Sequence, residues 1–104
     1  MGDIYHQLIK ISHEFENHTD ESLAESADLY AAGASAITSA LTLIGNLALN
    51  AVDSEDYSDE EARRDLILIS YALLQLPRIE QAFNQNSATA DYMRVQRRKA
   101  EAKK

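Results

Sequence analysis

Apolar residues recur along the first half of the chain at the spacing of an α-helix. Between residues 22 and 52 one stripe repeats at alternating steps of four and three, the seam pattern of helices that pack knobs into holes. Its members are Leu23, Ala27, Tyr30, Ala34, Ile37, Leu41, Ile44, Ala48 and Ala51. Ser22 and Glu25 fit a capping box at the start of the stripe. The pattern therefore predicts one long helix over residues 22–52.

A second apolar stripe runs beside this seam. Its members are Leu29, Gly33, Ala36, Ala40, Leu43 and Leu47. Gly33 lies in the stretch 31–36, where every side chain is small, and small side chains let another helix approach closely. The predicted helix is thus expected to bury two faces against different neighbours.

A shorter helical pattern precedes the long helix. Residues 3–16 place four apolar side chains at helical steps, with Asp3 as the expected N-cap. These side chains are Ile4, Leu8, Ile11 and Phe15. The polar residues 16–20 that follow indicate a turn.

A third helix is predicted from Asp59, after a second capping box formed by Ser58 and Glu61. Its expected seam consists of Ala62, Leu66, Ile69, Leu73 and Leu76, with Leu68 and Tyr71 toward another side. Pro77 has no backbone N–H, so it is expected to kink or interrupt this helix. The run 84–86 is the predicted stop. A last helix capped by Ser87 or Thr89 and a fraying charged tail are expected to follow.

These lengths predict an all-α fold. The helix over 22–52 would be about 45 Å long at 1.5 Å per residue, and a partner rod of similar length follows after a short connection. We therefore expect an antiparallel hairpin of two long helices, with a short N-terminal helix and a charged C-terminal helix or tail. The faces left over by one hairpin predict a homodimer that forms a helical bundle. The expected dimer interface comprises Leu29, Gly33, Ala36, Ala40, Leu43, Leu47, Leu68 and Tyr71.

Charge divides the chain into two parts. Residues 1–91 sum to −12 and residues 92–104 to +5, within a total of −7 over 104 residues. We therefore expect an acidic helical domain over 1–91 and a basic C-terminal helix or tail over 92–104. The basic residues of this tail are Arg94, Arg97, Arg98, Lys99, Lys103 and Lys104.

Catalytic and metal chemistry lack the residues they need. The chain has no cysteine and only three glycines, which excludes thiolate chemistry and glycine-rich phosphate loops. His6, His13 and His18 show no metal-ligand spacing. A calcium loop that starts at Asp53 would have Arg64 where glutamate is required. We expect no enzyme, no cofactor and no metal site.

A binding function remains, and the acidic segment between the long helices is its best candidate. Residues 53–61 hold six acids and no base. Such a segment can compete with phosphate for the basic surface of a partner protein. The sequence thus predicts a cytoplasmic regulator or inhibitor with the size and charge of a phage- or prophage-type protein. The expected partner-binding residues are Asp53, Glu55, Asp56, Tyr57, Asp59 and Glu60, with Tyr57 exposed among the acids.

Two alternatives remain open at this point. The basic tail could bind nucleic acid through its phosphates, weakly and without sequence preference. The second alternative is a small membrane protein. Residues 29–52 carry no charge and are long enough to span a bilayer. Soluble burial is favoured over a span because polar side chains gather along one strip and acids flank the segment. No signal peptide is recognisable at the N-terminus.

Overall fold

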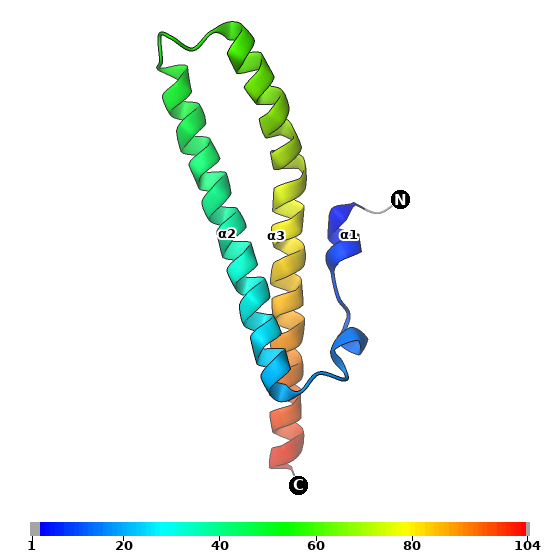
Figure 1. Cartoon of the computed structure of the whole chain (residues 1–104). Helices are drawn as coiled ribbons and strands as arrows, with labels where there is room; N and C mark the ends of the chain where they lie inside the picture. Colours follow the sequence, from blue (N-terminus) through cyan, green and yellow to red (C-terminus); the bar gives the residue numbers. More distant parts are fainter. Residues whose placement is uncertain (1–2, 104) are drawn as a thin grey trace.

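The computed structural model describes residues 3–103 as helices joined by short connections (Figure 1). A short helix α1 (Ile4–Leu8) and a 3₁₀ helix η1 (Ser12–Phe15) precede two long helices, α2 (Asp20–Val52) and α3 (Asp59–Ala102). No β-strand occurs within the described residues. The prediction of an all-α fold is confirmed.

The two long helices lie side by side and run in opposite directions (Figure 1). Their axes diverge from the start of α2 toward the connection at residues 53–58. The chain measures 69 × 29 × 15 Å and its radius of gyration is 19.3 Å, against about 13 Å for a compact chain of this length. The molecule is therefore a rod with the α2–α3 connection at one end and the C-terminus of α3 at the other.

Helix α2 begins earlier than the sequence pattern predicts. Thr19 is the N-cap, and its hydroxyl oxygen accepts a hydrogen bond from the backbone N–H of Ser22 at 3.0 Å. The predicted cap at Ser22 is therefore wrong. Thr19 and Ser22 both have hydroxyl side chains, and the acids Asp20 and Glu21 in the first turn suit the positive end of the helix.

Helix α3 begins at Asp59 as predicted, with the hydroxyl oxygen of Ser58 accepting from the N–H of Glu61 at 3.1 Å. Pro77 lies inside α3, and the helix continues through it. Proline leaves one carbonyl of the preceding turn without its helical partner, which is a recognised cause of bending. Figure 1 shows the axis of α3 bending between its green and yellow parts, ahead of Pro77.

The predicted stop at residues 84–86 and the separate last helix are wrong, because α3 is helical as far as Ala102. The polar side chains in this region form tertiary contacts. The hydroxyl of Ser87 donates to the carbonyl oxygen of Ala27 at 2.7 Å, which joins α3 to α2. The hydroxyl of Thr89 donates to the carbonyl oxygen of Gln85 at 3.0 Å within the helix. The predicted fraying of the tail is also wrong for residues up to 102.

The buried core lies where α2 starts and the last third of α3 passes it. Phe15 of η1 packs there with Leu23 and Ala27 of α2 and with Ala90 of α3. Small alanines at the contact allow the two helices to approach closely. The core therefore occupies the terminal end of the rod, and the connection end contributes no fully buried residue.

Residues 3–18, which we call the N-terminal segment, bind along α3. The amide of Asn86, buried in α3, accepts from the N–H of Lys10 at 2.6 Å and donates to the carbonyl oxygen of Leu8 at 3.0 Å. These two bonds occupy backbone groups that a continuous helix over 3–16 would have used. The prediction of one helix over 3–16 is therefore wrong, whereas Asp3 is the N-cap of α1 as predicted.

Asp3 also holds the start of this segment against α3. Its carboxylate lies 2.6 Å from the Nε of Arg78, and the guanidinium of Arg78 lies 4.5 Å from the centre of the Tyr5 ring. The hydrogen bond from Arg78, together with the bond from the N–H of His6, outweighs partial desolvation and lowers the pKa of Asp3. In Figure 1, α1 lies on the side of α3 away from α2.

Candidate functional site

The connection end of the rod exposes a large amount of apolar side chain. We call α2 from Leu43 to Val52 and α3 from Leu66 to Leu74 the apolar half. Its exposed apolar residues are Leu43, Leu47, Leu49, Val52, Leu66, Ile67, Leu68, Tyr71, Leu73 and Leu74. So many exposed apolar side chains on two neighbouring helices of a small protein indicate a binding surface.

The rotation of α3 about its axis brings several of these side chains to the surface. Partly buried positions recur at Ala62, Asp65, Ile69, Ala72 and Leu76, again at steps of three and four. The expected seam contained Leu66 and Leu73, which are 65% and 53% exposed. That part of the predicted seam is wrong by one position, because Asp65 and Ala72 take the places facing α2.

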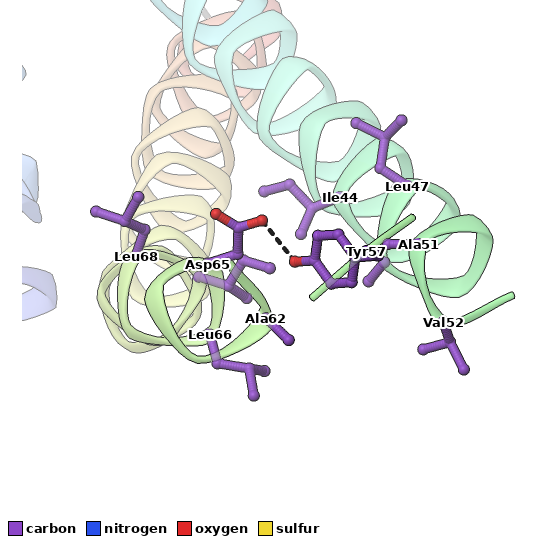
Figure 2. A pocket seen from close by; sticks show the side chains of 11 residues that line it. Ile44, Leu47, Ala51, Val52, Tyr57, Ala62, Asp65, Leu66 and Leu68 are labelled. Carbon is purple, nitrogen blue, oxygen red and sulfur yellow. Dashed lines mark hydrogen bonds between the residues drawn. The ribbon is translucent and has the colours of Figure 1, made fainter. Parts of the chain in front are cut away.

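A polar contact accounts for Asp65 in the seam. The hydroxyl of Tyr57, in the connection, donates to a carboxylate oxygen of Asp65 at 2.5 Å (Figure 2). This hydrogen bond, aided by partial desolvation and the negative charge of Asp65, raises the pKa of the Tyr57 phenol. Tyr57 is half-buried, so the prediction of an exposed Tyr57 is wrong. The contact ties the connection to the first turns of α3.

A cavity of about 390 Å³ lies between the diverging ends of α2 and α3. Figure 2 shows side chains of both helices around it, with the Tyr57–Asp65 pair crossing the space between them. Apart from that pair the lining is apolar, and it consists of Ile44, Leu47, Ala48, Ala51, Val52, Ala62, Leu66, Leu68 and Ile69. Leu47, Val52, Leu66 and Leu68 are each more than half exposed, so this space is open to solvent. The helices of the apolar half thus do not fill the space between them.

The acids at the connection are exposed and form the end of the rod. We call residues 53–61 the acidic tip. The structure places the predicted acidic residues Asp53, Glu55, Asp56, Asp59 and Glu60 at its surface. They can meet a partner directly, whereas the Tyr57 side chain is turned into the cavity.

Most residues of the predicted dimer interface are exposed, and Gly33 is the exception. Leu29, Ala36 and Ala40 are exposed on α2 outside the apolar half. A Cβ added to Gly33 would stand 2.9 Å from a ring atom of Phe83. Gly33 therefore serves the contact between α2 and α3 within one chain.

Two of the basic residues near the C-terminal end of α3 form contacts within the chain. Arg97 donates to the carbonyl oxygens of His18 at 2.6 Å and Glu16 at 3.1 Å and pairs with Asp20 at 3.0 Å. Arg94 pairs with Asp91 at 3.3 Å. The remaining described bases of the predicted tail are exposed, namely Arg98, Lys99 and Lys103. Lys104 lies outside the described residues.

Among residues 3–103, no cluster of three or more histidine and carboxylate side chains has the geometry to hold a metal ion. His13 lies 3.1 Å from the carboxylate of Glu16, close to it in sequence. His6 and His18 stack edge-on against Tyr5 and Phe15 respectively. The histidines therefore take part in local contacts.

Within residues 3–103, one helix, α2, is long and apolar enough to cross a membrane. Its most apolar stretch of 18 residues has a mean hydropathy of 1.4, and 6% of that stretch is buried. Core helices of soluble proteins can have similar composition, but they are mostly buried. The low burial of this stretch of α2 agrees with the exposure of the apolar half. Both observations show apolar side chains that have no neighbour within one chain.

Comparison with protein-family models, curated proteins and solved structures gives no match to this chain.

Proposed function

We propose that this chain is an acidic helical protein–protein interaction module. In this proposal α2 and α3 form an antiparallel hairpin, and two hairpins associate through their apolar halves into a helical bundle. The assembled homodimer presents its acidic tips to the basic surface of a partner protein and acts as a regulator or inhibitor by occupying that surface.

The observation that carries this proposal is the exposed apolar half beside an unfilled cavity. Burial of apolar area stabilises an assembly by about 25 cal/mol per Å² before the costs of association are subtracted. Leu68 is 62% exposed and lines the cavity. A second hairpin laid on this surface removes such side chains from water and supplies neighbours that one chain lacks.

Sedimentation velocity at micromolar concentration tests the self-association. The wild-type chain is expected to sediment as a dimer, and Leu68→Glu is expected to sediment as a monomer because a charge would be buried in the interface. Tyr92→Glu is the matched control, since Tyr92 is 60% exposed at the other end of α3. A monomeric wild-type chain would contradict the proposal.

Charge reversal tests the role of the acidic tip. Affinity purification from the native host with the triple substitution Glu55→Lys, Asp56→Lys and Asp59→Lys is expected to lose the partner that the wild-type chain retains. The control substitutes Glu21→Lys, Glu25→Lys and Asp28→Lys, which are exposed on α2 and change the net charge equally. Equal recovery of the partner by both triple variants would reject the tip as the binding site.

A second candidate is a small membrane protein that spans the bilayer with residues 29–52. The observation in its favour is the low burial of the most apolar stretch of α2. Fractionation of cells that express the chain separates the two functions. Recovery in the soluble fraction without detergent supports the interaction module, and recovery only with detergent supports the membrane protein.

A further inference from the structure

We infer, on the basis of the proposed self-association, that the second copy lies antiparallel on the apolar half with the two-fold axis at Leu68. The acidic tip of each copy then lies beside Arg78 of the other copy. Four features of the molecule lead to this arrangement: an α3 face that is covered over only part of its length, the excess surface, the distribution of charge and the cavity.

One face of α3 has a neighbour over only part of its length. Arg78 belongs to this face, and the described part of the N-terminal segment begins there, at the Asp3–Arg78 ion pair. From Arg78 toward the C-terminus of α3, the N-terminal segment covers the helix as far as Arg97. Arg97 binds the carbonyl oxygens of residues 16 and 18. From Arg78 toward the N-terminus of α3, the same face continues at helical steps and every residue on it is exposed. These residues are Gln75, Tyr71, Leu68, Arg64 and Glu61.

The uncovered length has a natural limit at each end. From Ser58, the N-cap, to Arg78 is 20 residues, or about 30 Å of helix. At Arg78 the N-terminal segment prevents the second copy from lying further along α3. At the other end, α3 itself begins after the connection, so the shared face stops there. Two antiparallel copies that use this whole length therefore place the axis midway, at Leu68.

The surface area fits an extensive contact. The chain exposes 7766 Å², whereas a compact monomer of 11.6 kDa would expose about 5,800 Å². The excess, about 1,900 Å², is larger than the roughly 800 Å² that each partner contributes to a standard interface. Counted over two copies, the excess is about 3,800 Å², within the roughly 2,000–5,000 Å² that obligate homodimers bury in total.

Charge favours the antiparallel orientation over the parallel one. Residues 53–65 carry a net charge of −5, with Arg63 and Arg64 included. Parallel copies would hold two such ends side by side, within the Debye length of about 8 Å at physiological salt. Antiparallel copies separate the two Glu61 residues by about 21 Å along the helix. Each tip then faces the Asp3–Arg78 ion pair of the other copy, whose two charges cancel.

The cavity lies at the same level as the proposed axis. Leu68 lines it from α3, and Leu47 lines it from α2. A residue on a two-fold axis meets its own equivalent in the second copy. The second copy's Leu68 is thus placed to pack beside the opening and reduce the unfilled space.

Single-cysteine variants test the orientation, because the chain has no cysteine of its own. Glu61 and Gln75 lie seven residues on either side of Leu68. With a short flexible bismaleimide, Leu68→Cys is expected to link to itself. Glu61→Cys alone is expected to give no link, whereas an equal mixture of Glu61→Cys and Gln75→Cys gives the mixed product. Gln96→Cys, exposed at the basic end, is the control for random collision.

The outcomes separate this inference from the proposed function. Self-linking of Glu61→Cys without the mixed product shows a parallel dimer, which overturns the antiparallel arrangement and leaves self-association standing. Absence of every link from a chain that sediments as a monomer overturns both. Recovery of the chain only in detergent, without links, also overturns both and assigns the apolar half to lipid. Circular dichroism of each variant verifies that the helices are retained.

Discussion

A single buried amide determines where the first part of the chain lies. Asn86 is fully buried, and its oxygen and nitrogen bond to the backbone of Lys10 and Leu8. Buried polar groups are tolerated when they are hydrogen-bonded and costly when they are not. The sequence places Asn86 within a polar triplet that indicates a loop, and nothing local shows that its partners lie more than 70 residues away.

Replacing Asn86 tests this attachment. Asn86→Ala is expected to lower the free energy of unfolding by about 1–3 kcal/mol, because the Lys10 N–H and the Leu8 carbonyl lose their partner. The measurement is urea denaturation followed by circular dichroism, with limited proteolysis to detect release of residues 9–19. Asn84→Ala is the matched control, because Asn84 is exposed on the same helix. Equal stability of the two variants would refute the role given to Asn86.

The Tyr57–Asp65 contact makes the connection sensitive to high pH. Asp65 raises the pKa of the Tyr57 phenol in the folded state, so the neutral phenol is favoured by folding. Its contribution to stability is complete below the ordinary tyrosine pKa of about 10. The contribution is lost as the pH rises through the higher pKa of the folded state.

A titration of ¹³C-labelled tyrosine by NMR measures this shift. The resonance of Tyr57, assigned with Tyr57→Phe, is expected to titrate above the ordinary tyrosine range. In Asp65→Ala its pKa should move down toward that range, because the largest cause of the shift is gone. A Tyr57 pKa that does not respond to Asp65→Ala would show that the hydrogen bond is absent in solution.

At the scale of the helices, the two glycines of α2 have different roles. Gly33 lies against the ring of Phe83, which also packs with Tyr30 at 5.6 Å between ring centres. Gly45 has no neighbour within 4 Å of the position its Cβ would take. The sequence predicts close helix packing around Gly33, and the structure supports that prediction, whereas Gly45 has no close neighbour within one chain.

Alanine substitutions separate the two glycines. Gly45→Ala is expected to raise the free energy of unfolding by about 0.5–1 kcal/mol, because alanine has the higher helix propensity. Gly33→Ala adds a Cβ 2.9 Å from Phe83, and overpacking of this kind typically costs about 1–3 kcal/mol. Thermal unfolding in parallel samples measures both variants. Equal stabilisation by the two substitutions would show that α2 and α3 do not approach closely at residue 33.

Element boundaries show how far local patterns reach. Ser58 and the start of α3 are predictable, because a capping box is a contact within one turn. The seam of α3 is harder to predict, since Leu66 and Leu73 fit a helical stripe as well as Asp65 and Ala72 do. Asp65 faces α2 because Tyr57 of the connection binds it. Just after Pro77, Arg78 pairs with Asp3 and Glu80 accepts from the hydroxyl of Thr38, contacts that local spacing does not reveal.

At the scale of the whole molecule, the rod has a covered half and an uncovered half. The N-terminal segment, α2 and α3 together enclose Phe15 and Leu23 at the terminal end. At the connection end only α2 and α3 are present, and they leave a cavity of about 390 Å³ between them. Stability of the connection end is therefore expected to come from association.

Coupling between folding and association predicts that stability depends on concentration. The midpoint of thermal unfolding is expected to rise with protein concentration, because assembly stabilises only the folded chain. Differential scanning calorimetry over a hundredfold range of concentration measures this effect. Leu68→Glu should unfold at one temperature throughout the range. A wild-type midpoint independent of concentration would contradict the proposed dimer.

The amino-acid sequence by itself determines the helical class, the two long apolar patterns, the acidic connection and the cap at Ser58. These features depend on residue type and on neighbours within about two turns, which a periodic pattern records. The tertiary structure alone decides the path of the N-terminal segment, the rotation of α3 and the inward position of Tyr57. Each of these depends on a contact between distant residues, such as Asn86 with Leu8, whose energy has no counterpart in local spacing.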